Sequence, residues 1–134
     1  MTIHSKIQAE FEPKRPCRFQ VIFPEIMEIQ PFYVKELSKL SFNFRTKEYD
    51  DLTFSLYDVI GHNLTEKLVT SLVNTRKKII TINIQSLDPV GDIIESFGII
   101  GDLLEVDLGT YSYGLQDELS IIKLIIKPND ILFK

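Results

Sequence analysis

The chain has 134 residues, of which 44% are hydrophobic and 25% are charged, and its formal net charge is −4 at pH 7. These values predict one globular domain over residues 1–134 and argue against a sequence-specific DNA binder, which would need a basic patch. The single cysteine, Cys17, leaves no partner for an intramolecular disulfide, and no apolar run reaches the roughly 18 residues that a membrane span needs. Residues 1–6 lack a signal-peptide pattern, so we expect assembly in a cytoplasm.

The N-terminal segment is predicted to hold an arm followed by a strand. Residues 1–15 should form an extended arm, because Pro13 and Pro16 disfavour a helix there. Apolar and other residues alternate strictly from Arg18 to Phe23, which predicts a strand that ends at Pro24.

The next segment is predicted to form two strands joined by a charged turn. From Phe32 to Phe44 the apolar positions change parity at Leu37 and again at Leu40. One long strand here must therefore contain bulges or bend, as strands of a barrel do. The charged connection over residues 45–50 leads to a cleanly alternating strand over Leu52–Leu56.

One substantial helix is predicted after residue 63. Asn63 can cap the first turn, and Glu66 is placed to reach back to it, as in a capping box. Leu64, Leu68 and Leu72 repeat every four residues, which is typical of the helix side that faces a core.

Three strands are predicted between residues 80 and 108. The first covers 80–85, with isoleucine at every second position. Residues 88–92, Asp-Pro-Val-Gly-Asp, predict a turn, because proline fixes φ, glycine supplies positive φ, and aspartate bonds its own backbone. A short strand over 93–97 and another over 104–108 should follow, each ended by glycine-containing segments.

The last predicted strand covers residues 119–127 and is apolar on both faces, so both faces should be covered. The helix or another subunit could cover the second face. We expect Lys127-Pro128-Asn129-Asp130 to end this strand and Ile131-Leu132-Phe133 to form an apolar tail. An exposed apolar tail is typical of an interface.

These elements predict a mostly β fold: a small β-barrel or sandwich of about six to eight antiparallel strands with one flanking α-helix. A particular order of motifs extends over most of the chain. It comprises Leu87-Asp88-Pro89, Gly91, Phe97, Gly101, Val106-Asp107-Leu108-Gly109, Tyr113 and Glu118-Leu119, with weaker positions at Pro24, Lys35 to Phe44 and Leu56-Tyr57-Asp58. In this order the chain resembles the tail tube proteins of contractile-tailed bacteriophages, whose fold is shared with the tube proteins of related contractile injection systems. It departs from them in having no tryptophan.

The resemblance implies a structural virion protein. Subunits would form six-membered rings that stack into the inner tail tube, a conduit for double-stranded DNA on its way into the host. The tail sheath, the baseplate and a tape-measure protein would be its partners in the tail of the virion, with no cofactor and no membrane.

Three sets of residues are candidates for this role. Polar strand faces with few cations would line a channel to which phosphates do not adhere, and their candidates are Thr53, Ser55, Thr81, Asn83 and Gln85, with the acids Glu105 and Asp107. The resemblance implies that the loop at Arg45, Thr46, Lys47, Glu48 and Tyr49 reaches toward the next ring. Candidates for contacts between subunits are Leu119, Ile121, Ile125, Leu132 and Phe133.

Other hypotheses remain at this stage. The same fold could serve as a tube-initiating ring on the baseplate or as an injection-system tube. A ligand-binding β-barrel or a small hydrolase is a less favoured possibility, the latter using paired acids among Asp88, Asp92, Asp102 and Asp107. Turn chemistry explains these acids better, and His4, His62 and Cys17 show no metal-ligand or nucleophile–base spacing. We therefore predict no enzymatic activity.

Overall fold

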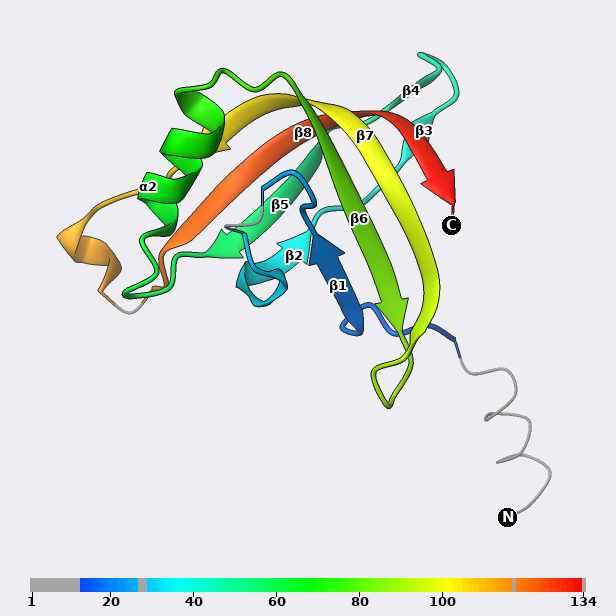
Figure 1. The fold of residues 1–134 in the computed structure, drawn as a ribbon, viewed down its shortest axis with the longest axis horizontal. Coiled ribbons are helices and arrows are strands. Elements are labelled where there is room, and N and C mark those ends of the chain that lie inside the picture. Colours follow the sequence, from blue (N-terminus) through cyan, green and yellow to red (C-terminus); the bar gives the residue numbers. More distant parts are fainter. Residues whose placement is uncertain (1–12, 27–28, 117, 134) are drawn as a thin grey trace.

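The computed structural model describes residues 13–26, 29–116 and 118–133, so most of the predicted arm over residues 1–15 lies outside the described residues. Six antiparallel strands form one strongly curved, nearly closed sheet in the order β1-β6-β7-β8-β5-β2 (Figure 1). The strands are β1 Phe19–Ile22, β2 Val34–Leu37, β5 Leu52–Tyr57, β6 Ile79–Leu87, β7 Ile93–Asp107 and β8 Ile121–Phe133. A separate two-stranded hairpin consists of β3 Phe42–Asn43 and β4 Glu48–Tyr49. The predicted mostly β fold with one helix is confirmed.

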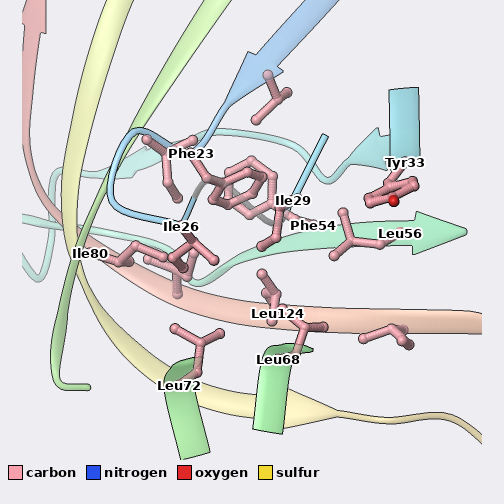
Figure 2. Packing of buried hydrophobic residues seen from close by; sticks show 14 of the residues in the cluster. Phe23, Ile26, Ile29, Tyr33, Phe54, Leu56, Leu68, Leu72, Ile80 and Leu124 are labelled. Carbon is pink, nitrogen blue, oxygen red and sulfur yellow. The ribbon is translucent and has the colours of Figure 1, made fainter. Parts of the chain in front are cut away.

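The core fills the inside of the curved sheet. Alternate residues of β5, β6 and β8 point into it, and Phe23 packs edge-on against Phe54 with ring centroids 5.6 Å apart (Figure 2). The fully buried strand residues are Val21, Leu52, Phe54, Leu56, Ile80, Ile82, Ile99, Ile122, Leu124 and Ile126. The alternation in the sequence thus assigns the inward face of these strands correctly.

One helix covers the inside of the sheet. It begins as α2 Leu64–Leu68 and continues as a wider π-type turn, η2 Val69–Val73. Its predicted apolar stripe is buried, and Leu68 and Leu72 point toward Leu124 of β8 (Figure 2). Over the described part of the chain, no helix combines the length and apolar character that crossing a bilayer requires.

The predicted cap of this helix is wrong. Asn63 adopts a left-handed conformation with φ 52° and ψ 43°, and its side chain makes no capping hydrogen bond. A capping side chain reaches the first turn from an extended backbone. Here only the Asn63 carbonyl oxygen takes part, accepting the N–H of Lys67 at 3.1 Å.

The single long strand predicted from Phe32 to Phe44 is also wrong. Pro31–Tyr33 form a 3₁₀ turn, η1, and β2 then pairs with β5 through one irregularity between Val34 and Glu36. The pairing stops because β5 begins at Leu52, and the last contact is Ser38 N–H to the Thr53 carbonyl at 2.8 Å. The chain then leaves the sheet and builds the β3–β4 hairpin.

The two strands predicted over 93–97 and 104–108 are one strand, β7. The glycine at 101 does not interrupt it, because β8 pairs along it on both sides of that residue. A Cβ at Gly101 would lie 2.6 Å from the Lys127 carbonyl oxygen, so the close approach of the two strands requires glycine. A second irregularity between Leu103 and Glu105 turns Leu103 inward and leaves Leu104 exposed, contrary to the predicted alternation.

The predicted end of the last strand at residues 127–130 is wrong as well. β8 begins at Ile121, leaving Leu119 in the preceding loop, and runs to Phe133, so that the expected apolar tail is part of the sheet. Pro128 is tolerated because it lies opposite Gly101 at an irregularity, where the regular ladder is already interrupted.

Candidate assembly surfaces

The face of the sheet opposite the core carries the polar strand residues. Thr53 lies opposite Ile125 in the pairing of β5 with β8, and Asn83 lies opposite Gly98 in the pairing of β6 with β7. Because neighbours in register share a face, all five predicted channel residues lie on the face away from the core, although Ser55 is buried there. They are Thr53, Ser55, Thr81, Asn83 and Gln85. That this face lines a channel remains a prediction.

This outer face is acidic on the four central strands. Its carboxylates on β7 and β8 are Asp102, Glu105, Asp107 and Asp130, and its lysines are Lys123 and Lys127. Each lysine lies directly opposite a carboxylate, Lys123 opposite Asp107 and Lys127 opposite Asp102. Lys127 also donates to Glu48 at 2.9 Å, and this hydrogen bond raises the pKa of Lys127. The lysines of this face therefore have local negative charge beside them.

The β3–β4 hairpin contains the predicted inter-ring loop. Asn43 holds the turn by accepting the N–H of Arg45 at 2.9 Å, and Lys47 takes a left-handed conformation with φ 58°. The rings of Phe42 and Phe44 pack edge-on, with centroids 5.2 Å apart. The predicted loop is thus the turn of a two-stranded hairpin, and its contact with another ring stays a prediction.

The predicted subunit-contact residues are split between two places. Leu119 is 73% exposed beside the start of β8, where Ile121 and Ile125 lie half-buried on the outer face. Leu132 and Phe133 are exposed at the far end of the same strand, Phe133 to 75%. The helix packs on the core face, so it does not cover the second face of β8. That another subunit covers this face remains a prediction.

Parts of the sheet have unpaired edges. Residues 127–133 of β8 pair with β7 on one side, and no main-sheet strand of the described chain pairs on the other. β1 pairs with β6 only over Asn83–Ser86, so the edge at Thr81 has no partner strand there. Glu25 satisfies this edge, because it accepts the Thr81 backbone N–H at 3.1 Å and forms an ion pair with Lys77. The Lys77 hydrogen bond is the main cause that lowers the pKa of Glu25. Beyond Ile126 the edge of β8 thus has no partner strand in the main sheet, although Glu48 of the hairpin reaches Lys127 and the Ile131 N–H is bonded to Asp130 Oδ1 at 2.9 Å.

Sequence reasoning missed an open hollow beside the start of β8. Its volume is about 730 Å³, and its apolar wall includes Tyr111, Tyr113, Leu115, Leu119 and Ile121. The loop between β7 and β8 builds it through a short 3₁₀ turn, η3 Tyr113–Leu115. The sequence signal for this hollow was the pair Tyr111 and Tyr113 in a turn-rich segment. Such a segment does not show which strands it will pack against.

The acids proposed for a hydrolase do not converge on one cleft. Asp88 closes the β6–β7 turn by accepting the N–H of Val90 at 3.0 Å and of Asp92 at 2.8 Å, as the turn prediction requires. Asp102 and Asp107 lie apart along β7, each facing a lysine. Among the residues that the structure describes, no three His, Cys, Asp or Glu side chains gather as metal ligands would.

The remaining reactive side chains have structural surroundings. His62 forms a 2.5 Å hydrogen bond through Nδ1 with the buried Tyr33 hydroxyl, and its ring packs edge-on against Phe32. Cys17 is a free thiol and is exposed. His4 lies outside the described residues.

The fold is tail-tube-like, and it is found in solved structures of contractile injection systems. No family model matches the sequence, and no curated protein matches it significantly. A chain of the sheath-tube complex of the extracellular contractile injection system PVC, in its extended state, has a TM-score of 0.68 at 10% identity, covering 100% of this chain and 99% of that one.

Two further similar chains come from the anti-feeding prophage. One, from the tube-terminating cap, has a TM-score of 0.66 at 12% identity and covers 100% of this chain and 99% of its own. The other, from the baseplate, has a TM-score of 0.58 at 14% identity and covers 92% and 97%. At such low identity the similarity establishes the shared fold over nearly the whole chain.

Proposed function

We propose that the protein is a structural subunit of a contractile-tail tube, in which six copies form a ring and rings stack. The tube would be a passive conduit, without catalytic activity, through which double-stranded DNA passes. The observation that carries this proposal is the division of the sheet into an inner face that holds the apolar core and an outer face that mixes uncharged polar residues and carboxylates with isoleucines such as Ile100 and Ile125. A lone globular domain needs the first face, whereas the second suits the wall of a channel.

The chemistry of the outer face supports a channel for DNA. DNA phosphates are held by unpaired lysines and arginines, whose binding releases counterions. On the four central strands the cations are Lys123 and Lys127, and both lie opposite carboxylates. Uncharged side chains such as Thr81, Asn83 and Gln85 fill the neighbouring positions. A duplex would therefore find little to hold it against this wall.

The open edge of β8 supports ring closure. A strand of a neighbouring subunit could pair along residues 127–133, where no main-sheet strand of the described chain pairs, and replace the hydrogen bond that the Ile131 N–H makes to Asp130 Oδ1. Leu132 and Phe133 at this edge would then be covered. Such a contact joins different surfaces of two copies, and heterologous contacts of this kind close into rings.

The proposed partners are the tail sheath, the baseplate and a tape-measure protein, and the proposed location is the tail of a virion assembled in a host cytoplasm. The similar chains come from a sheath-tube complex, a cap and a baseplate. A tube-initiating ring and an injection-system tube are thus the nearest alternatives. Copy number per particle separates them, because a tube protein is present in many rings and an initiator in one.

Electron microscopy of negatively stained purified protein tests the proposal. We expect rings with a central hole, and stacks of rings at higher concentration. A Leu132→Glu variant should remain monomeric, because it places a charge at the β8 edge, while Leu104→Glu, on an exposed position of β7, should still form rings. Wild-type protein that stays monomeric at millimolar concentration would contradict the proposal.

A further inference from the structure

Two complementary features lie at opposite ends of the molecule. At one end is the tip of the β3–β4 hairpin, and at the other is the loop between β7 and β8 with its hollow (Figure 1). The tip of one copy therefore cannot reach the hollow of the same copy. Any contact between them joins two molecules head to tail, which extends an assembly along one direction.

The hairpin tip presents an aromatic ring flanked by cations. Phe44 is 85% exposed even though its ring packs against Phe42. Arg45 and Lys47 follow it, are exposed, and make no ion pair with another described residue. The acid that follows, Glu48, is neutralised by Lys127 of the same chain. The tip is thus an apolar knob with net positive charge.

The hollow offers the complementary surface. Its apolar wall contains Tyr113, which is 95% exposed, and Leu115, and its volume of about 730 Å³ is within the range that receives ligand-sized groups. Glu118 is part of its rim. A shallower adjoining hollow shares Tyr111 and carries Glu66. The lining also holds Asp107 and Lys123, which lie opposite each other, so that Glu118 is the carboxylate without a lysine opposite it. The receiving end is thus an aromatic pocket with a net negative border.

We propose that the Phe44 tip of one copy inserts into the hollow of another, with Arg45 and Lys47 facing the acidic rim. This inference rests on the proposed tube function, because stacking presents the tips of one layer to the hollows of the next. Insertion covers an exposed aromatic side chain and brings opposite charges together, which favours the correct register over alternatives. The loop over residues 45–49 was predicted to reach another ring, and this proposal names the hollow as the surface that it contacts there.

Disulfide cross-linking tests the geometry. In a Cys17→Ser background, Phe44→Cys combined with Leu115→Cys should give a ladder of linked subunits on a non-reducing gel, because each copy carries both partners. Phe44→Cys combined with Val90→Cys is the control, since Val90 is more exposed than Leu115, at 81% against 37%, but lies in the β6–β7 turn. This control should give no ladder, and neither should the single variants.

Charge reversal tests the chemistry. The Arg45→Glu, Lys47→Glu variant should form rings but lose about tenfold or more of its stacked mass, because like charges would face each other. Adding Glu66→Lys and Glu118→Lys should restore stacking. Rings of the Phe44→Cys, Leu115→Cys variant that stack without cross-linking, or stacking that the compensating changes do not restore, would overturn this inference and leave the tube function standing. Wild-type protein that forms neither rings nor stacks would overturn both.

Discussion

The two faces of the six-stranded sheet obey different constraints, although the same strands build both. The inner face requires apolar side chains of fitting shape, because every one of them is removed from water. The outer face is defined by what it omits: apart from two lysines opposite carboxylates, the central strands place no cation there. The comparison shows that stability is located on one face, and that the features suited to a channel are located on the other.

The largest effect should come from adjacent residues of β8 that point to opposite faces. Leu124→Ala should lower the free energy of unfolding by about 3 kcal/mol, because it leaves a cavity in a fully buried site. Ile125→Ala, on the half-buried outer face, should cost less than about 1.5 kcal/mol in the monomer. Urea titration followed by circular dichroism measures both. Equal losses would contradict the division into two faces.

Two glycines of β7 sharpen the comparison at the level of the backbone. Gly101→Ala should destabilise the fold by about 1–3 kcal/mol, because its Cβ would lie 2.6 Å from a backbone oxygen of β8. At Gly98 the nearest atom to an added Cβ is Oδ1 of Asn83, at 3.2 Å on the outer face. Gly98→Ala should therefore cost less than about 1 kcal/mol, measured by the same titration. A larger loss at Gly98 would show that the outer face is as tightly packed as the core.

Lysines placed on the outer face should make a tube retain DNA. Asn83→Lys with Gln85→Lys adds two cations per subunit, so duplex retention should rise about tenfold per engaged subunit when salt falls from about 200 to about 50 mM. Thr70→Lys with Asn74→Lys adds the same charge to the exposed side of the helix and should change little. Retention is measured by filter binding on assembled tubes. Unaltered passage through the first variant would count against the lining role.

The smallest effect concerns the ion pair that closes the β6 edge. The lowered pKa of Glu25 means that this carboxylate stabilises the fold at pH values above its ordinary pKa. The contribution is lost as the pH falls through the lowered pKa of the folded state. Because both partners are about a third exposed, Glu25→Gln should cost about 0.5 kcal/mol at neutral pH.

The pH dependence separates this pair from a more exposed one. The deficit of Glu25→Gln in the urea midpoint should narrow as the pH falls below the ordinary pKa of a glutamate, because the wild-type carboxylate then becomes protonated. Glu95→Gln, which removes the more exposed pair with Lys14, should show a smaller deficit at every pH. If the loss of stability in Glu25→Gln were independent of pH, the charge of Glu25 would not contribute to the stability of the fold.

Strands that carry their own alternation could be predicted from the sequence, together with the faces they present. The strands β1, β5 and β6 and the apolar stripe of the helix fall where the pattern places them, because each pattern is local. The same local signals misled at Gly101 and Pro128. Glycine and proline usually end a strand, but the pairing of β7 with β8 continues past both residues. This continuation depends on the partner strand and cannot be predicted from a local pattern.

The polar face could be predicted from alternation, whereas the hollow could not. Thr81, Asn83 and Gln85 share a face because residues two apart in a strand always do. The hollow depends on how the loop after Gly109 folds back beside Ile121, which involves tertiary packing that no periodic pattern encodes. Phe44 was assigned to a long bending strand, so its exposure at a hairpin tip also escaped prediction.

A cryo-electron microscopy map of the assembled wild-type protein tests the central claim most directly. The predicted map shows stacked six-membered rings whose channel wall is the outer face of the sheet, with Thr81, Asn83 and Gln85 toward the axis and the helix outside. A map in which the helix faces the axis, or particles that contain no ring, would contradict the claim.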